Sequence, residues 1–155
     1  MIMSKKQEYK NILNFENARR KDQKDLMKII KDDGICPFCK ENLEKYHPKP
    51  ILFKTKKWIV TENAFPYTGT SNHILCIYKK HIEDSKDIDG EGWSEIGEIM
   101  TRLNEDLEID SGTMIMRFGD TTKTGATVNH VHFHLTQANP ENPDYPEGGI
   151  ITRIG

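Results

Sequence analysis

The stretch that decides the fold reads His-Val-His-Phe-His-Leu at residues 130–135, three histidines alternating with three apolar residues. Alternation with a period of two is typical of a half-buried β-strand, so a strand is expected over residues 127–135 with the imidazoles on one face. Successive side chains on one face lie about 7 Å apart, since a strand rises about 3.3 Å per residue. Each imidazole costs free energy when it leaves water and can exchange a proton near neutral pH. The row therefore indicates a functional site, and a histidine-rich surface strand or a chance metal-binding tract is the plainer alternative.

Hydrophobic patterns elsewhere predict further strands and one main helix. Strands are expected over the two halves of residues 50–62, over 73–78 and over 113–117. A helix is expected over 92–107, where apolar side chains recur at helical spacing. Closely spaced strands with one intervening helix are typical of the α+β class, so we expect a mostly antiparallel sheet with this helix packed on it.

The N-terminal segment differs from the rest in its many charges. Residues 5–32 carry scattered apolar side chains, which suits one or two amphipathic helices ended by Asp33-Gly34. We therefore divide the chain into a helical extension over residues 1–34 and a single domain over 35–155. The proline-rich tail beyond residue 138 is expected to be irregular.

Composition limits the class of protein. A chain of 155 residues has room for one domain. No apolar run approaches the roughly 18 residues that span a bilayer, and the N-terminus lacks the apolar core of a secretion signal, so no membrane partner and a cytoplasmic location are expected. The formal net charge of -2 argues against a nucleic-acid partner.

Two of the three cysteines form Cys36-Pro37-Phe38-Cys39, directly after a turn signal. In a reducing compartment such a pair is either half of a metal site or a redox pair. The redox interpretation needs a thioredoxin-like strand-to-helix context that this chain lacks, so zinc is favoured, with redox-active or inert thiols as alternatives. Cys76 lies in an apolar run and is expected in the core.

The histidine strand resembles the signature of the histidine-triad (HIT) superfamily of nucleotide hydrolases and transferases. Residues 73–81, an apolar strand that begins with His and ends in a basic pair and His, are similar to another segment of that family. Residues 63–67 resemble its base- and ribose-holding loop, and residues 125–127 resemble its phosphate-contacting turn. The resemblance covers about residues 36–137 and implies a HIT-like fold.

The resemblance also implies a covalent mechanism. A neutral imidazole can attack phosphorus without prior deprotonation. By resemblance, His132 is the nucleophile that forms a nucleotidyl-histidine, His134 lies near the scissile bridging atom, and His73 completes the polar cluster. Thr127 would donate to a phosphate oxygen and stabilise the transition state. The implied substrate-binding residues are Asn63 at the ribose, Phe65 and Tyr67 at the base, and Gly125 and Ala126 in the phosphate turn. For Asn63, Phe65 and Tyr67, the alternative is an ordinary turn whose aromatic side chains only fill space.

The resemblance to zinc-containing branches of the superfamily implies a set of metal ligands. At the matching positions of this sequence the ligands are Cys36, Cys39, His81 and His130. Two sulfur and two nitrogen ligands form a closed tetrahedral site, so the zinc would be structural. His47 is the competitor for one of the histidine positions.

The leading functional interpretation is a hydrolase that cleaves a nucleoside phosphoramidate, dinucleoside polyphosphate or related adduct at the α-phosphorus. Transferring branches usually have Gln where His134 stands, so water is the favoured acceptor. Two departures from the family pattern are Ala126, where hydrolases often carry a polar amide, and a longer loop between Tyr67 and His73. A nucleotidyl transferase or phosphorylase and a non-catalytic nucleotide-binding module are the alternatives. A DNA-adenylate repair role is disfavoured, because no basic excess is visible.

A homodimer is the expected assembly. The helix over residues 92–107 carries more apolar surface than one small sheet needs to cover, and family members commonly pair through this helix. The extension over residues 1–34 is the rival for that surface.

Overall fold

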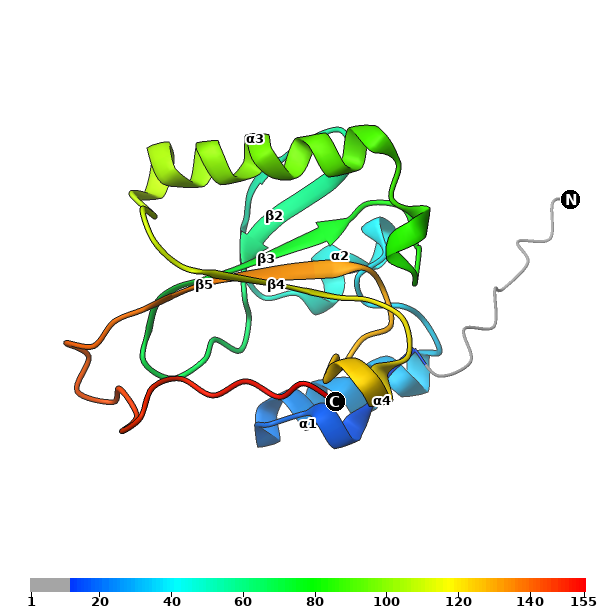
Figure 1. Ribbon diagram of the computed structural model, residues 1–155. Coiled ribbons are helices and arrows are strands. Elements are labelled where there is room, and N and C mark those ends of the chain that lie inside the picture. The colour runs from blue at the N-terminus through cyan, green and yellow to red at the C-terminus, as the bar shows by residue number, and fades with distance from the viewer. Residues whose placement is uncertain (1–11) are drawn as a thin grey trace, which may run out of the picture.

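The computed structural model describes residues 12–155, so residues 1–11 of the predicted extension lie outside the described part (Figure 1). Its centre is a five-stranded antiparallel sheet in the order β1-β2-β3-β5-β4. The strands are β1 (Ile51–Lys54), β2 (Trp58–Glu62), β3 (Thr70–Tyr78), β4 (Thr113–Arg117) and β5 (His132–Ala138). The predicted α+β class with a mostly antiparallel sheet is confirmed.

One face of the sheet packs against helix α3 (Gly90–Leu107), as predicted (Figure 1). The helix begins two residues earlier than expected, because the Asp89 side chain accepts a hydrogen bond from the backbone N–H of Gly92 and caps it. Its buried residues join Trp58, Phe133 and other strand side chains in the main core. Cys76 is completely buried there, as expected of a core residue.

The histidine strand is shorter than predicted. β5 begins at His132, so His130 precedes the strand, and the expected start at residue 127 is wrong. The backbone of this segment is paired outside the sheet: Asn14 donates to the Thr127 carbonyl, and Asn129 donates to the Ile12 carbonyl. The N-terminal segment thus occupies the hydrogen-bonding groups that a longer strand would need.

Helix α1 (Lys21–Asp33) ends where the sequence predicts. Gly34 follows it in the left-handed conformation at φ 66°, and its N–H bonds to the carbonyls of Ile30 and Lys31. A short 3₁₀ turn, η1 (Phe15–Asn17), precedes the helix. Figure 1 shows α1 on the side of the sheet opposite to α3. The described part of the extension therefore does not cover the outer surface of α3.

Three short elements were not predicted. They are α2 (Lys40–Tyr46), α4 (Thr121–Thr124) and the 3₁₀ turn η2 (Ser85–Asp87). The tail after residue 138 contains turns and no helix or strand, and it runs on the same side of the sheet as α1 (Figure 1). Within residues 12–155, no helix combines the length and apolar character needed to cross a membrane.

Candidate active site and metal centre

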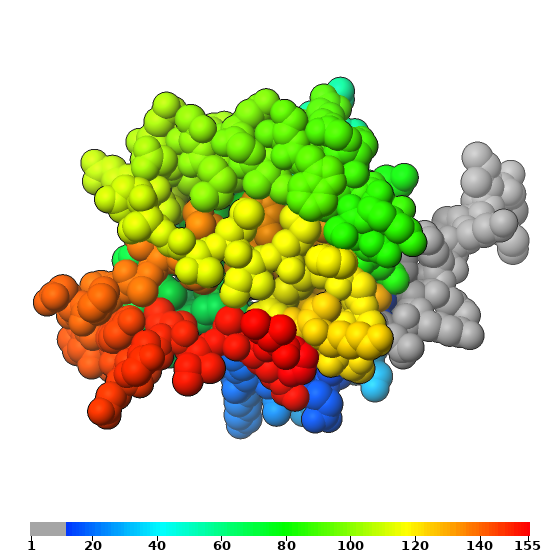
Figure 2. All heavy atoms as spheres, in the orientation of Figure 1, coloured from blue at the N-terminus to red at the C-terminus, as the bar shows by residue number. Residues whose placement is uncertain are grey.

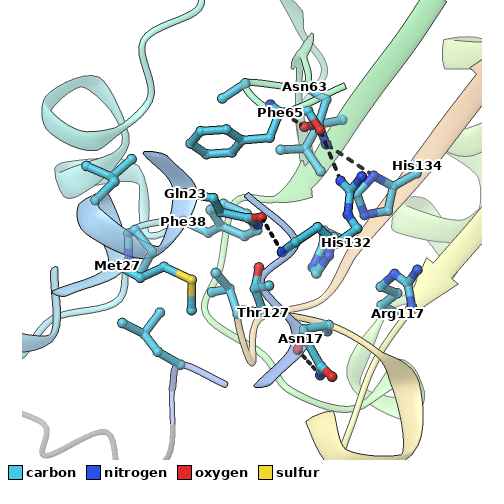
Figure 3. Close-up of a pocket in the computed structure, with 18 of the residues that line it drawn as sticks. Asn17, Gln23, Met27, Phe38, Asn63, Phe65, Arg117, Thr127, His132 and His134 are labelled. Carbon is cyan, nitrogen blue, oxygen red and sulfur yellow. Dashed lines mark hydrogen bonds between the residues drawn. The ribbon is translucent and has the colours of Figure 1, made fainter. Parts of the chain in front are cut away.

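A pocket opens on the sheet face that α3 leaves uncovered (Figure 3). Its walls come from the sheet, the N-terminal segment, the Cys-x-x-Cys loop and the tail. Figures 2 and 3 show how these distant segments meet: the tail lies across one side of the molecule, and the side chains of the other segments point into the pocket. The residues used below are Asn17, Arg19, Phe38, Asn63, Phe65, Tyr67, Arg117, Thr127, His132, His134 and Thr152, which all line it.

His132 is held as a neutral imidazole with one free nitrogen. Its Nδ1 lies 2.6 Å from the His130 carbonyl oxygen, which can only accept, so Nδ1 carries the proton and Nε2 keeps its lone pair. Burial lowers the pKa of His132 to about 4, and the positive charge of Arg117 adds to this effect. Phe38 packs edge-on against the ring at a centroid distance of 5.2 Å. His132 Nε2, the atom that could act as a nucleophile, is therefore unprotonated at neutral pH.

His73 and His134 form a hydrogen-bonded pair, and a backbone N–H determines which ring nitrogen of each carries the proton. The N–H of Tyr67 donates to His73 Nδ1 at 3.0 Å, so the proton of His73 is on Nε2. That nitrogen lies 2.9 Å from His134 Nδ1, which also faces the side-chain amide of Asn63 at 3.3 Å. His134 accepts at Nδ1 and carries its proton on Nε2. Burial lowers the pKa of His134 well below its usual range, because the charged form would lose its hydration.

His132 and His134 are neighbours on one face of β5. Their ring centroids are 5.2 Å apart, closer than the roughly 7 Å that strand spacing predicts. The rings meet edge to face, and the site brings a bare nitrogen on one ring next to an N–H on the other. Such a pair can attack an electrophile and hydrogen-bond the group that leaves it.

Arg117 is a pocket residue that the sequence analysis missed. It lies directly opposite His132 on β4, and opposite residues of an antiparallel pair share a face. It is only 5% exposed, and its guanidinium donates to the carbonyl oxygens of Thr124 and Arg153 and to the Thr152 hydroxyl. The sequence does show an arginine at the end of a predicted strand. Only the pairing of β4 with β5 shows that this arginine lies on the histidine face.

The predicted phosphate turn lies at the pocket with its backbone tightly held. Gly125 has φ 70°, and a Cβ there would lie 2.4 Å from the Arg153 carbonyl oxygen, so only glycine fits. Asn17 donates to the carbonyl oxygen of Ala126 at 2.7 Å. Thr127 lines the pocket beside His132 (Figure 3). The turn thus depends on both chain-terminal segments.

The segment from Asn63 to Tyr67 is both a turn and a pocket wall. The side-chain oxygen of Asn63 accepts from the N–H of Phe65 at 2.8 Å. The Tyr67 ring lies 4.4 Å from the His73 ring, and its hydroxyl contacts Thr152 at 2.7 Å. Phe65 is half-buried and lines the pocket. The segment therefore forms a turn whose side chains also line the pocket, and its binding of ribose and base stays a prediction.

Cys36, Cys39, His81 and His130 form a separate cluster next to the pocket. Their ligand atoms all lie within 4.8 Å of one another. Each cysteine sulfur is 3.4 Å from a histidine Nδ1, and the two Nδ1 atoms are 3.2 Å apart. These separations suit a tetrahedral metal ion with bonds of about 2.0–2.3 Å. The hydrogen bond from Cys36 lowers the pKa of the Cys39 thiol, which favours the thiolate that binds metal.

Contacts at the outer nitrogens of both histidines in this cluster orient the inner nitrogens for metal binding. His130 Nε2 donates to the Tyr78 carbonyl oxygen at 2.6 Å, and His81 Nε2 faces a Glu83 carboxylate oxygen at 3.3 Å. Each Nδ1 is thereby left as the acceptor that faces the cysteines. His47, the competing ligand, instead contacts the Thr61 hydroxyl and lines the pocket, outside the cluster.

Comparison with known proteins identifies the family. Residues 35–144 match the family model described as "Scavenger mRNA decapping enzyme C-term binding". The chain belongs to this family, within the histidine-triad superfamily. An "Uncharacterized HIT-like protein" of Chlamydia trachomatis is 31% identical over 87 residues, which are 54% of this chain and 76% of that relative.

Solved HIT structures share the fold. A HIT family hydrolase from Clostridium thermocellum is 26% identical with a TM-score of 0.52, covering 70% of this chain and 94% of that one. A histidine triad nucleotide-binding protein from Candida albicans is 23% identical with a TM-score of 0.57, covering 78% and 82%. A Zn-bound histidine triad family protein from Mycobacterium smegmatis is 21% identical with a TM-score of 0.52, covering 70% and 78%. The predicted superfamily and its fold are confirmed, and the cluster of two cysteines and two histidines is a candidate metal site.

Proposed function

We propose that this HIT-family protein is a nucleotide hydrolase. It cleaves a nucleoside phosphoramidate, dinucleoside polyphosphate or related adduct at the α-phosphorus, through a covalent nucleotidyl-histidine on His132. The observation that carries this proposal is the tautomer of His132, whose Nδ1–H is committed to the His130 carbonyl and whose Nε2 is bare in the pocket.

The reaction proceeds in two displacements. His132 Nε2 attacks the α-phosphorus, and the bond from phosphorus to the leaving group breaks with its electron pair going to that group. The N–H on His134 Nε2 hydrogen-bonds the departing atom. Water then attacks the same phosphorus, the P–N bond returns its electron pair to His132, and a nucleoside monophosphate leaves. The proton lost by water balances the one that a basic leaving group takes up.

Donors around the pocket stabilise the charge that develops on phosphorus. We assign the Thr127 hydroxyl and the turn of Gly125 and Ala126, which line the pocket, to the phosphate oxygens, and Arg117 supplies a positive charge from β4. We assign Asn63 to the ribose and Phe65 and Tyr67 to the base, because all three line the same pocket. These assignments rest on the family pattern and on the shared pocket wall.

We propose that the metal site holds structural zinc through Cys36, Cys39, His81 and His130. Four protein ligands leave no position for water, so a bound zinc would stiffen the Cys-x-x-Cys loop and supply no hydrolytic water. Phe38, between the two cysteines, is the side chain that this loop holds against His132.

A turnover panel tests the hydrolase proposal. Adenosine and guanosine phosphoramidates and dinucleoside polyphosphates are incubated with the full chain, and the products are resolved by mass. We expect nucleoside monophosphate with one oxygen from labelled water. Transfer to added phosphate or sugar phosphate would instead favour the phosphorylase alternative, and binding without turnover would favour a non-catalytic module.

We further propose a homodimer that uses the outer side of α3. Trp93 and Leu107 on this helix are 48% and 38% exposed, and Met114 on the edge strand β4 is 47% exposed. The described part of the extension lies on the other side of the sheet and leaves these side chains uncovered (Figure 1). Light scattering at micromolar concentration should give twice the chain mass of 17.9 kDa, and Trp93→Glu should shift the protein to monomer. A monomeric wild-type protein contradicts the dimer.

A further inference from the structure

Three arginines line the pocket, Arg19, Arg117 and Arg153, and none of them has an acidic side-chain partner among the described residues. The Arg153 guanidinium is held by the backbone oxygens of Glu16 and Gly155, so the charges to consider are those of Arg19 and Arg117. Elsewhere in residues 12–155, Arg20 pairs with Asp22 at 2.6 Å and Arg102 pairs with Asp106 at 3.1 Å. Arg19 and Arg117 have no carboxylate within 4.0 Å among the described residues, and none of the residues that line the pocket is Asp or Glu. The pocket thus carries positive charge that the described protein does not neutralise.

Arg117 supplies this charge from inside the protein. Its donors contact neutral oxygens only, those of Thr124, Arg153, Thr152 and Tyr67. Keeping a guanidinium buried without a counter-charge costs free energy, which an anionic ligand would recover. Its field extends to the histidines, since the positive charges of Arg19 and Arg117 add to burial in lowering the pKa of His73 to about 3.

Arg19 supplies the second charge from the N-terminal segment, outside the matched family region. Its guanidinium carbon lies 4.2 Å from the centre of the Tyr67 ring, and one N–H donates to the Phe65 carbonyl at 3.1 Å. Among the described residues this is the only hydrogen bond of the guanidinium, so other N–H donors remain for a ligand. Tyr67 in turn packs on His73, which places the guanidinium one ring away from the His73–His134 pair.

We propose that Arg19 and Arg117 form an anion subsite for the leaving group, so that the preferred substrates carry at least one further phosphate beyond the scissile bond. This inference rests on the proposed hydrolase function and names its substrate class. When the bridging P–O bond breaks, its electron pair goes to a phosphate-terminated leaving group whose charge the two guanidinium groups neutralise. That group departs without a proton. An amine leaving group would have to take up a proton next to these positive charges, and it would depart as a neutral amine that leaves both guanidinium groups without a counter-charge.

The test compares two substrates that differ only in the leaving group. Diadenosine triphosphate and an adenosine phosphoramidate of a simple amine share the adenosine and the reacting phosphorus. Arg19→Met removes the charge and keeps the length of an exposed side chain. We expect kcat/KM for diadenosine triphosphate to fall about 10- to 100-fold, the effect of one charged hydrogen bond, and kcat/KM for the phosphoramidate to fall much less. Arg19→Lys should restore part of the loss. Arg102→Met, which removes an equal charge on α3, should affect neither substrate.

A binding measurement separates this inference from the proposed function. Inorganic triphosphate is titrated calorimetrically into wild-type protein and into Arg19→Met, and weaker binding to the variant is expected. If Arg19→Met lowers both turnover rates equally, or if only the phosphoramidate is cleaved by the wild type, the anion subsite is rejected and the hydrolase stands. If neither substrate is cleaved but triphosphate binding depends on Arg19, the hydrolase is rejected and the anion subsite stands.

Discussion

The two faces of the central sheet use the same strands for opposite purposes. Along β5, Phe133 and Leu135 face α3 and are buried in an apolar core, while His132 and His134 face the pocket. The α3 face is closed by one amphipathic helix. The histidine face is closed by segments from both chain ends and by the Cys-x-x-Cys loop. Residues that stabilise the core and residues of the candidate active site therefore alternate along a single strand.

His132→Ala gives the largest expected effect and acts on the histidine face alone. Loss of the nucleophile should lower turnover by about 10³-fold or more, because the covalent step has no substitute. Nucleotide binding should persist, since the other pocket residues remain. Steady-state kinetics and a nucleotide titration measure the two quantities. Near-normal turnover would remove His132 from the mechanism.

Cys36→Ser tests whether the histidine face depends on the proposed zinc site. Loss of one ligand should empty the site and lower the free energy of unfolding by about 4 kcal/mol or more, since metal loss belongs to the most damaging class of change. Metal analysis and denaturant unfolding give the two values. Cys76→Ala, in the core on the α3 face, should keep one metal per chain and serves as the control. A metal-free wild-type protein would contradict the zinc proposal.

Phe133→Ala is the counterpart of His132→Ala, one residue along and on the other face. Phe133 is completely buried and packs edge-on against Trp58 at 5.1 Å. The truncation should lower the free energy of unfolding by about 3–5 kcal/mol while turnover per folded molecule is retained. Phe133→Leu, a smaller change, keeps the test available if the alanine variant does not fold. Equal losses of turnover from both faces would show that the faces are not independent.

The helix and strands of the α3 face were predictable, because the periodicity of apolar side chains depends only on residues close in the sequence. The helix over residues 92–107 and the strand over 113–117 follow from side-chain periodicity, and the structure has them as α3 (Gly90–Leu107) and β4 (Thr113–Arg117). The strand boundary at His132 was not predictable, since it depends on hydrogen bonds between residues 127–129 and residues 12–14. Periodicity cannot report a backbone partner that lies more than 100 residues away.

The candidate site was predicted only in part, for the same reason. The two histidine-rich segments and the cysteine pair are visible as motifs, and the structure brings them together. Arg19, Asn17 and Arg117 follow no motif. Asn17 meets Ala126 across 109 residues and Arg19 meets Phe65 across 46, so their place in the pocket arises from the fold.

The smallest expected effect is a pH dependence that belongs to the histidine face. His73 is 5% exposed, and burial, with the positive charges of Arg19 and Arg117, lowers its pKa from 6.5 to about 3. Between these values the unfolded chain binds a proton that the folded chain does not, so the unfolding free energy falls as the pH falls below about 6.5. His73→Gln cannot titrate, and its unfolding free energy should lose about 2 kcal/mol less than that of the wild type between pH 6.5 and 5. The difference between the two proteins cancels the contributions of the metal ligands and the other histidines. Urea unfolding at each pH measures it, and parallel curves for the two proteins would mean that His73 takes up its proton as readily in the folded state as in the unfolded chain.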